Sequence, residues 1–246
     1  MAAMSPTPAP TPSTTRLAHE LTGGQAGDAF ADELTDWLSS SPRFQAFATT
    51  YRAKIRKKVH SAADAEGLRD VRAELLAAYR LLEDRRFTVT YEAYGSGKVG
   101  PDLSVAYRST TTFNVEVTRL RKAPDPAAVG ATLLVKLRQL PPSVPNVVLV
   151  MSDRPASAVD VAGSVRALRD RADAKDDAFF ERRGLESSRG FYDRFLRLSA
   201  VISWRDEAHG DDRAALWINP SARISLPERA SRACLACFRG SIGGDG

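Results

Sequence analysis

The segment Asn146–Met151 places the strongest constraint on how this chain folds. Four consecutive apolar residues, Val147 to Val150, form its centre, so a strand here is hydrophobic on both faces. Such a strand is typical of the interior of a sheet that helices cover on both sides. The helical pattern before it, Asp125–Gln139, ends ahead of Pro141–Pro142 because proline cannot continue the helical hydrogen-bond ladder. The sequence therefore predicts an α/β fold in which a helix crosses over to a buried strand.

Three short strands are expected before this crossover. Phe87–Glu92, Leu103–Tyr107 and Thr112–Thr118 are rich in β-branched and aromatic residues and are separated by short glycine-rich or polar turns. Their close spacing makes them antiparallel neighbours. An amphipathic helix over Asp64–Arg86 leads into them. The core of residues 64–151 is thus predicted as a helix, a three-strand antiparallel meander, a crossover helix and a strand.

The flanking segments extend this core into one α/β domain over residues 16–240. Apolar residues at helical spacing predict N-terminal helices at Asp28–Leu38 and Arg43–Val59. A C-terminal α+β extension is expected, with helices and two strands that could join the same sheet: Val159–Arg171, Asp176–Arg182, Phe191–Phe195, Leu198–Trp204 and Ala215–Ile218. Residues 1–15 consist almost wholly of Ala, Pro, Ser and Thr, so we expect a disordered tail there.

The overall charge favours an anionic partner. The chain has 35 Lys and Arg against 30 Asp and Glu, a formal net charge of +5. No apolar run approaches the roughly 18 residues that a membrane span needs, and no secretory signal pattern is present. The expectation is a cytoplasmic protein that does not enter a membrane. Cys234 and Cys237 are too few for a disulfide framework and form only half of a zinc-site pattern.

Two carboxylates can meet on the polar side of the meander. In Phe113–Thr118 the apolar residues alternate with Asn114, Glu116 and Thr118, and Asp102 heads the preceding strand with the same parity. Neighbouring strands lie about 4.8 Å apart, so Asp102 and Glu116 can converge on one hard divalent cation such as Mg²⁺ or Mn²⁺. The alternative is that both are solvated positions on an amphipathic hairpin.

This order of elements and these residues resemble the PD-(D/E)xK nuclease superfamily, whose core is restriction-endonuclease-like. The matching residues are Pro101–Asp102 and, after a gap, Glu116–Val117–Thr118. The resemblance implies that Asp102 and Glu116 bind the metal and that Glu74, on the first core helix, assists. The sequence departs from the family at Thr118, which stands where the family has a catalytic lysine. Lys136 on the next helix is the expected substitute, and Lys98 is a weaker candidate. Either Thr118 or Lys136 is expected to place the attacking water.

The expected activity is metal-dependent hydrolysis of phosphodiester bonds in nucleic acid, with DNA as the expected substrate. Arg119, Arg121 and Lys122 follow the strand of Glu116, and we expect them to contact the phosphate backbone. Two alternatives stay open. The chain could be an inactive, nuclease-like module that binds nucleic acid, or a module that binds another protein.

Overall fold

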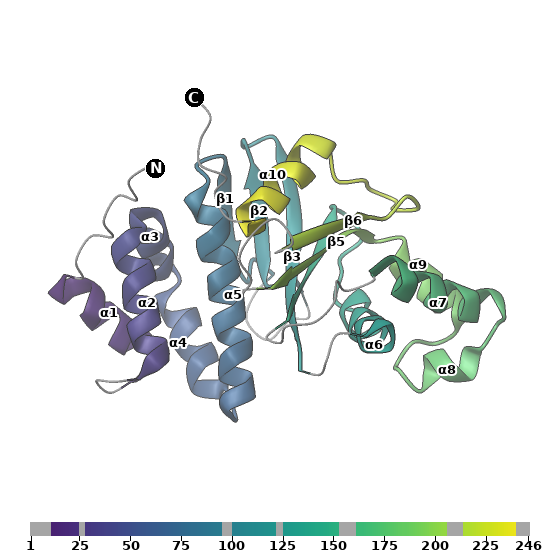
Figure 1. Ribbon diagram of the computed structural model, residues 1–246, viewed down its shortest axis with the longest axis horizontal. Coiled ribbons are helices and arrows are strands. Elements are labelled where there is room, and N and C mark those ends of the chain that lie inside the picture. The colour runs from purple at the N-terminus through teal and green to yellow at the C-terminus, as the bar shows by residue number, and fades with distance from the viewer. Residues whose placement is uncertain are drawn as a thin grey trace.

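The described part of the chain is a mixed α/β structure built on one six-stranded sheet (Figure 1). The computed structural model describes residues 11–24, 28–94, 100–121, 125–152, 161–205 and 214–239. The strands follow the order β1-β2-β3-β4-β5-β6 across the sheet. Their bounds are β1 Phe87–Tyr91, β2 Leu103–Tyr107, β3 Thr111–Leu120, β4 Asn146–Ser152, β5 Leu198–Arg205 and β6 Ala214–Ile218.

The strand directions divide the sheet into a meander and a parallel centre. Strands β1, β2 and β3 pair antiparallel, whereas β3, β4 and β5 run parallel and β6 closes the sheet antiparallel. Helix α6 (Pro126–Leu137) makes the crossover from β3 to β4. The predicted order of helix, meander, crossover helix and strand is confirmed, and so is the extension of the sheet by two later strands.

Helices cover both faces of the sheet. Helices α5 and α10 share one hydrophobic cluster with the strands, and α6, α7 and α9 share the other. Helices α1 to α4 lie on the outer side of α5 (Figure 1). The remaining bounds are α1 Pro12–Thr22, α2 Ala29–Ser40, α3 Pro42–Thr50, α4 Arg52–Ser61, α5 Ala65–Glu83, α7 Val161–Asp173, α8 Asp177–Glu181, α9 Ser188–Phe195 and α10 Glu228–Arg239.

Strand β4 is buried along its whole length, as its sequence predicts. Val147, Leu149 and Met151 pack in the cluster of α5 and α10, whereas Val148 and Val150 pack in the cluster of α6. A strand with helices on both sides needs apolar residues at both parities, which accounts for the uninterrupted run. This double burial fixes the neighbouring strand β3 in the interior of the fold.

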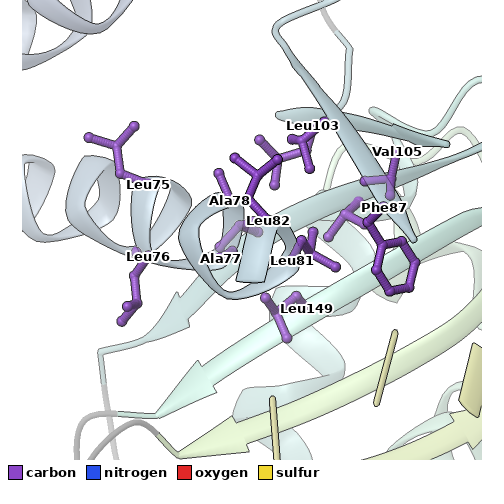
Figure 2. Close-up of a cluster of buried hydrophobic side chains, with 14 of the residues drawn as sticks. Leu75, Leu76, Ala77, Ala78, Leu81, Leu82, Phe87, Leu103, Val105 and Leu149 are labelled. Atoms are coloured by element: carbon purple, nitrogen blue, oxygen red, sulfur yellow. The ribbon is translucent and has the colours of Figure 1, made fainter. Parts of the chain in front are cut away.

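Helix α5 supplies much of the core on its side of the sheet. Figure 2 shows Leu81 of this helix lying over strand residues that include Phe87, Val105 and Leu149. Each fully buried leucine or phenylalanine side chain contributes about 2 to 3 kcal/mol relative to an exposed one. This packing holds α5 against the sheet. Glu74 is one of the buried residues of α5.

Three expectations at the N-terminal end need correction. Residues 1–10 of the predicted disordered tail lie outside the described residues, but residues 12 to 15 belong to α1, which Thr11 caps through its side chain. The predicted helix Arg43–Val59 is two helices, because Tyr51 adopts φ −99° and ψ 15° between α3 and α4. The predicted helix Asp64–Arg86 ends at Glu83 instead.

Helix α10 was not predicted. Its buried residues Ala230, Ala233, Cys234 and Phe238 recur at helical spacing, so the periodicity was present in the sequence. Cys234 is buried among them as a free thiol. Among the described residues, no helix has the length and apolar character needed to span a lipid bilayer.

Candidate functional site

Asp102 and Glu116 meet across neighbouring strands. The antiparallel register pairs Leu103 with Val115, so the residues one position further out, Asp102 and Glu116, lie across from each other. The Asp102 carboxylate accepts a hydrogen bond from the backbone N–H of Val117 at 2.9 Å. The backbone of Asp102 also accepts one from Glu92 at 2.9 Å, which fixes the start of β2 against the end of β1. The register thus supplies the convergence that the sequence pattern predicts.

Glu74 lies close to this pair, although it comes from helix α5. Its side chain is buried, and Oε2 accepts hydrogen bonds from Lys58 Nζ at 2.6 Å and from the Tyr91 hydroxyl at 2.8 Å. Lys58 Nζ also lies 3.3 Å from Asp102 Oδ1 and 3.6 Å from Glu92 Oε1. Helix α4 therefore places one ammonium group among three carboxylates.

Glu116 has a lysine of its own. Lys136 on α6 donates to Glu116 Oε1 at 2.5 Å. The other carboxylate oxygen, Oε2, is buried and has no hydrogen-bond partner among the described residues. A buried polar atom without a partner is costly, by about 1 to 3 kcal/mol. Such an atom points to a group that completes it.

Burial controls the protonation of the two glutamates. It raises the pKa of Glu116 to about 7, with a further increase from the nearby Asp102 charge, whereas Lys136 acts in the opposite direction. It raises the pKa of Glu74 to about 8, again with help from Asp102 and against Lys58 and Tyr91. Both carboxyl groups are therefore near their titration range at neutral pH, even beside their lysines.

The lysines respond differently. Burial lowers the pKa of Lys58, but the Glu74 and Asp102 carboxylates more than offset this and raise it overall. Lys136 behaves in the same way, with burial opposed by Glu116 and Asp102. Hydrogen bonds of 2.5 to 2.6 Å between each ammonium and its glutamate favour the ion-paired form. Both lysines therefore stay positively charged at neutral pH.

The cluster combines oxygen donors with lysine ammonium groups. Four carboxylates face two ammonium groups, so the fully ionised cluster has a charge of minus two. The free Oε2 of Glu116 and the oxygen-only ligands suit Mg²⁺ or Mn²⁺. No group of three or more His, Cys, Asp or Glu side chains in the described part of the chain is arranged to hold a metal ion. Lys58 stands between the carboxylates instead, so a metal ion has to displace it.

The other predicted site residues lie apart from this cluster. Thr118 is half-buried on β3, two residues after Glu116. Arg119 is buried beneath α5, where its guanidinium hydrogen-bonds to Asp70 at 3.1 Å and to Glu66. Arg121 is exposed but pairs with Asp70 at 2.6 Å, and Lys122 and Lys98 fall outside the described residues. Arg119 is therefore engaged with α5 rather than presented to a phosphate backbone.

Lys58, Tyr91 and Glu92 are the site residues that the sequence did not single out. Lys58 belongs to a run of basic residues on α4 that reads as one charged face. Its place in the sequence could have identified it. Lys58 lies three residues after Ile55 and one before Val59, the two buried residues of α4, so it stands at the edge of the buried face of this helix. For Tyr91 the sequence predicted only a position near the end of a strand.

In comparisons with known proteins, no family model, no curated protein and no solved structure matches this chain.

Proposed function

We propose that this protein is a metal-dependent nuclease of the PD-(D/E)xK type, with a restriction-endonuclease-like core and DNA as its substrate. The observation that carries the proposal is the state of Glu116. It is 2% exposed, lies across from Asp102, contacts Lys136, and keeps one oxygen without a partner in the described structure. The matching order of core elements supports the same assignment.

Asp102 and Glu116 would hold the ion, Mg²⁺ or Mn²⁺. Bound there, it would lower the pKa of a water molecule and stabilise charge on the scissile phosphate. The Asp102 carboxylate is already oriented by the Val117 N–H, and the orientation of Glu116 is set by Lys136. The two side chains are therefore preorganised on rigid strands.

Lys136 replaces the lysine that Thr118 cannot provide. Its ammonium lies 2.5 Å from Glu116 Oε1, and the surrounding carboxylates keep it protonated. A protonated lysine cannot take a proton from water at neutral pH. Its role in this proposal is to donate a hydrogen bond to the phosphate or to the attacking water, and so to supply positive charge where negative charge develops.

Glu74 assists by positioning. Its Oε2 bonds to both Lys58 and the Tyr91 hydroxyl, so it determines where the Lys58 ammonium lies. Lys58 in turn pairs with both Glu74 and Asp102 and offsets one of their two negative charges. With an ion held by Asp102, Lys58 would be released from this pairing and would be available to an anionic substrate.

The basic residues beyond β3 contribute unequally to DNA binding in this proposal. Arg121 is exposed at the end of β3 and pairs with Asp70. When DNA binds, Arg121 leaves Asp70 and contacts a phosphate. Lys122 follows it in the chain. Arg119 stabilises the contact between β3 and α5 through Glu66 and Asp70 and reaches no phosphate.

A cleavage assay on supercoiled plasmid and on single-stranded DNA with Mn²⁺ tests the proposal. The wild type should cut, Asp102→Asn should not, and Lys136→Met should be inactive while it still binds Mn²⁺. Lys57→Met, which removes an exposed lysine beside Lys58, is the matched control and should cut like the wild type.

A second candidate function rests on Lys58. Its ammonium occupies the space among Glu74, Glu92 and Asp102 without any ion, as it would in a nuclease-like module that binds DNA but has lost catalysis. If the wild type and Asp102→Asn both bind DNA and are equally inert on every substrate, this binding-module function replaces the nuclease.

A further inference from the structure

A cavity lined by arginines lies at the C-terminal end of α6. It has a volume of about 520 Å³, within the range of small-ligand sites. Its walls come from the end of α6, from the loop between α8 and α9, and from α9. Three arginines line it, Arg138, Arg194 and Arg197, together with Gln139.

The positive charge in this cavity is only partly compensated, because Glu186 and Asp193 also line it. None of the three arginines forms an ion pair with a carboxylate among the described residues, whereas Arg86 and Arg171, for example, do. Burial and the charges of Arg194 and Arg223 lower the pKa of Arg197, and Asp193 offsets this only in part. An anion bound among these groups would remove the mutual repulsion of the arginines.

Two buried polar atoms in the cavity wall lack partners. Arg197 Nε and Gln139 Oε1 are both buried and have no hydrogen-bond partner in the described structure. Arg197 Nε is a hydrogen-bond donor, whereas Gln139 Oε1 is an acceptor and cannot donate to a phosphate. Arg197 is also anchored by its bond from Nη1 to Leu140 O at 3.2 Å. Its guanidinium is therefore held in place with an unused N–H.

Gly184 shapes the cavity so that Arg138 can lie in it. A Cβ atom at Gly184 would lie 2.6 Å from Arg138 Nη1, and the glycine has φ +76°. The positive φ favours glycine at this position, whereas the flexible end of Arg138 could move away from a Cβ atom. The backbone thus makes room for one guanidinium fork, and such forks bind phosphate groups with two parallel hydrogen bonds.

We propose that this cavity is a nucleotide site, in which Arg138, Arg194 and Arg197 bind a 5′-phosphate. The exposed carboxylates of Glu186 and Asp193 also line it and suit the hydroxyl and amino donors of a sugar and base. A phosphate alone would leave those acceptors unused. The phosphate is carried either by a free nucleotide or by the end of a strand. This site does not depend on the metal or on the proposed nuclease activity.

Calorimetry on the full chain in buffer with EDTA tests the site, because chelation removes any contribution of the carboxylate cluster. The probes are adenosine 5′-monophosphate, adenosine, inorganic phosphate, and a short oligonucleotide with a 5′-phosphate or a 5′-hydroxyl. The monophosphate should bind at least about tenfold more tightly than adenosine and than inorganic phosphate. If the oligonucleotide with a 5′-phosphate also binds more tightly than the one with a 5′-hydroxyl, the end of a strand is a second source of the bound phosphate.

Variants locate the site. Arg138→Gln combined with Arg194→Gln should weaken monophosphate binding by at least about tenfold. Arg189→Gln removes an exposed arginine from the same helix, α9, outside the cavity, and should change the affinity less than about twofold. If the double glutamine variant unfolds, Arg138→Lys with Arg194→Lys keeps the charge and should still lose affinity because the forks are gone.

The proposal is overturned by any of three results: no binding of the monophosphate at about 10 mM, equal binding of adenosine or inorganic phosphate, or an equal loss of affinity in Arg189→Gln and the double variant.

Discussion

Asn114 and Glu116 lie two residues apart on the same side of β3 and are almost equally buried, at 1% and 2% exposure, yet their surroundings differ. Asn114 accepts from the Ser104 hydroxyl at 2.9 Å and donates to Asn146 Oδ1 at 3.0 Å. Asn146 in turn donates to three backbone carbonyls. Glu116 has one lysine and a free oxygen.

The contrast separates a fully hydrogen-bonded polar cluster around Asn114 from the candidate functional cluster around Glu116. A buried polar network is stable when every member is satisfied, as around Asn114. The cluster around Glu116 combines several carboxylates, raised glutamate pKa values and a missing partner, a combination typical of binding and catalytic sites. The two clusters should therefore respond oppositely to substitution, with stability depending on Asn114 and activity on Glu116.

The largest expected effect is on cleavage. Glu116→Gln keeps the volume of the side chain and an acceptor for Lys136, but removes the charge that holds the ion. We expect metal-dependent cleavage to fall by at least about 100-fold with the thermal midpoint nearly unchanged. The cleavage rate and the melting curve of the same sample measure both quantities. Cleavage within a few-fold of wild type would show that Glu116 is no ligand.

A substitution in the other cluster, at Asn114, should act on stability instead of on cleavage. Asn114→Ala leaves Asn146 Oδ1 and the Ser104 hydroxyl without their partner, so we expect the free energy of unfolding to fall by about 2 to 3 kcal/mol. Urea denaturation measures this loss. Mn²⁺ affinity of the folded variant should match the wild type, and a large loss of affinity would mean that the two clusters act as one.

A smaller effect concerns pH. Because burial raises the pKa of Glu116 to about 7 and of Glu74 to about 8, above their ordinary value of 4.5, the folded protein binds more protons than the unfolded chain between these limits. Stability should thus decrease as pH rises from 5 to 8 in metal-free buffer, with a slope of at most about 1.4 kcal/mol per pH unit for each group. Glu116→Gln should flatten the profile, and Asn114→Ala should shift it without changing its shape.

The smallest expected effect concerns DNA binding. Arg121→Gln should reduce the slope of log affinity against log salt by about 0.9, the value for one phosphate contact on duplex DNA. Fluorescence anisotropy at several salt concentrations gives this slope. The same substitution should leave Mn²⁺ affinity alone, and an unchanged slope would remove Arg121 from the DNA interface.

The sequence predicted the elements whose pattern is local. The apolar run of β4 and the alternation in β3 follow from strand geometry alone, whereas the pairing of Asp102 with Glu116 also depends on the register of β2 and β3, which the sequence left open. Residues that reach the site only through the packing of helices on the sheet were harder to predict. Lys58 is one of several basic residues on α4, and only the position of α4 beside α5 shows which of them enters the site. Arg119 looked exposed because β3 was expected to end at Thr118. The strand continues to Leu120, so Arg119 falls beneath α5 and meets Glu66 and Asp70.

The central claim is that Asp102 and Glu116 hold a divalent cation while Asn114 does not take part. Calorimetric titration of Mn²⁺ into the wild type, Glu116→Gln and Asn114→Ala at pH 7.5 tests it most directly. We predict binding by the wild type, binding by Asn114→Ala with similar affinity, and a loss of at least about tenfold in Glu116→Gln. Equal Mn²⁺ affinity in all three proteins, or no binding by the wild type, would contradict the claim and leave the carboxylate cluster as an ion-pair network centred on Lys58.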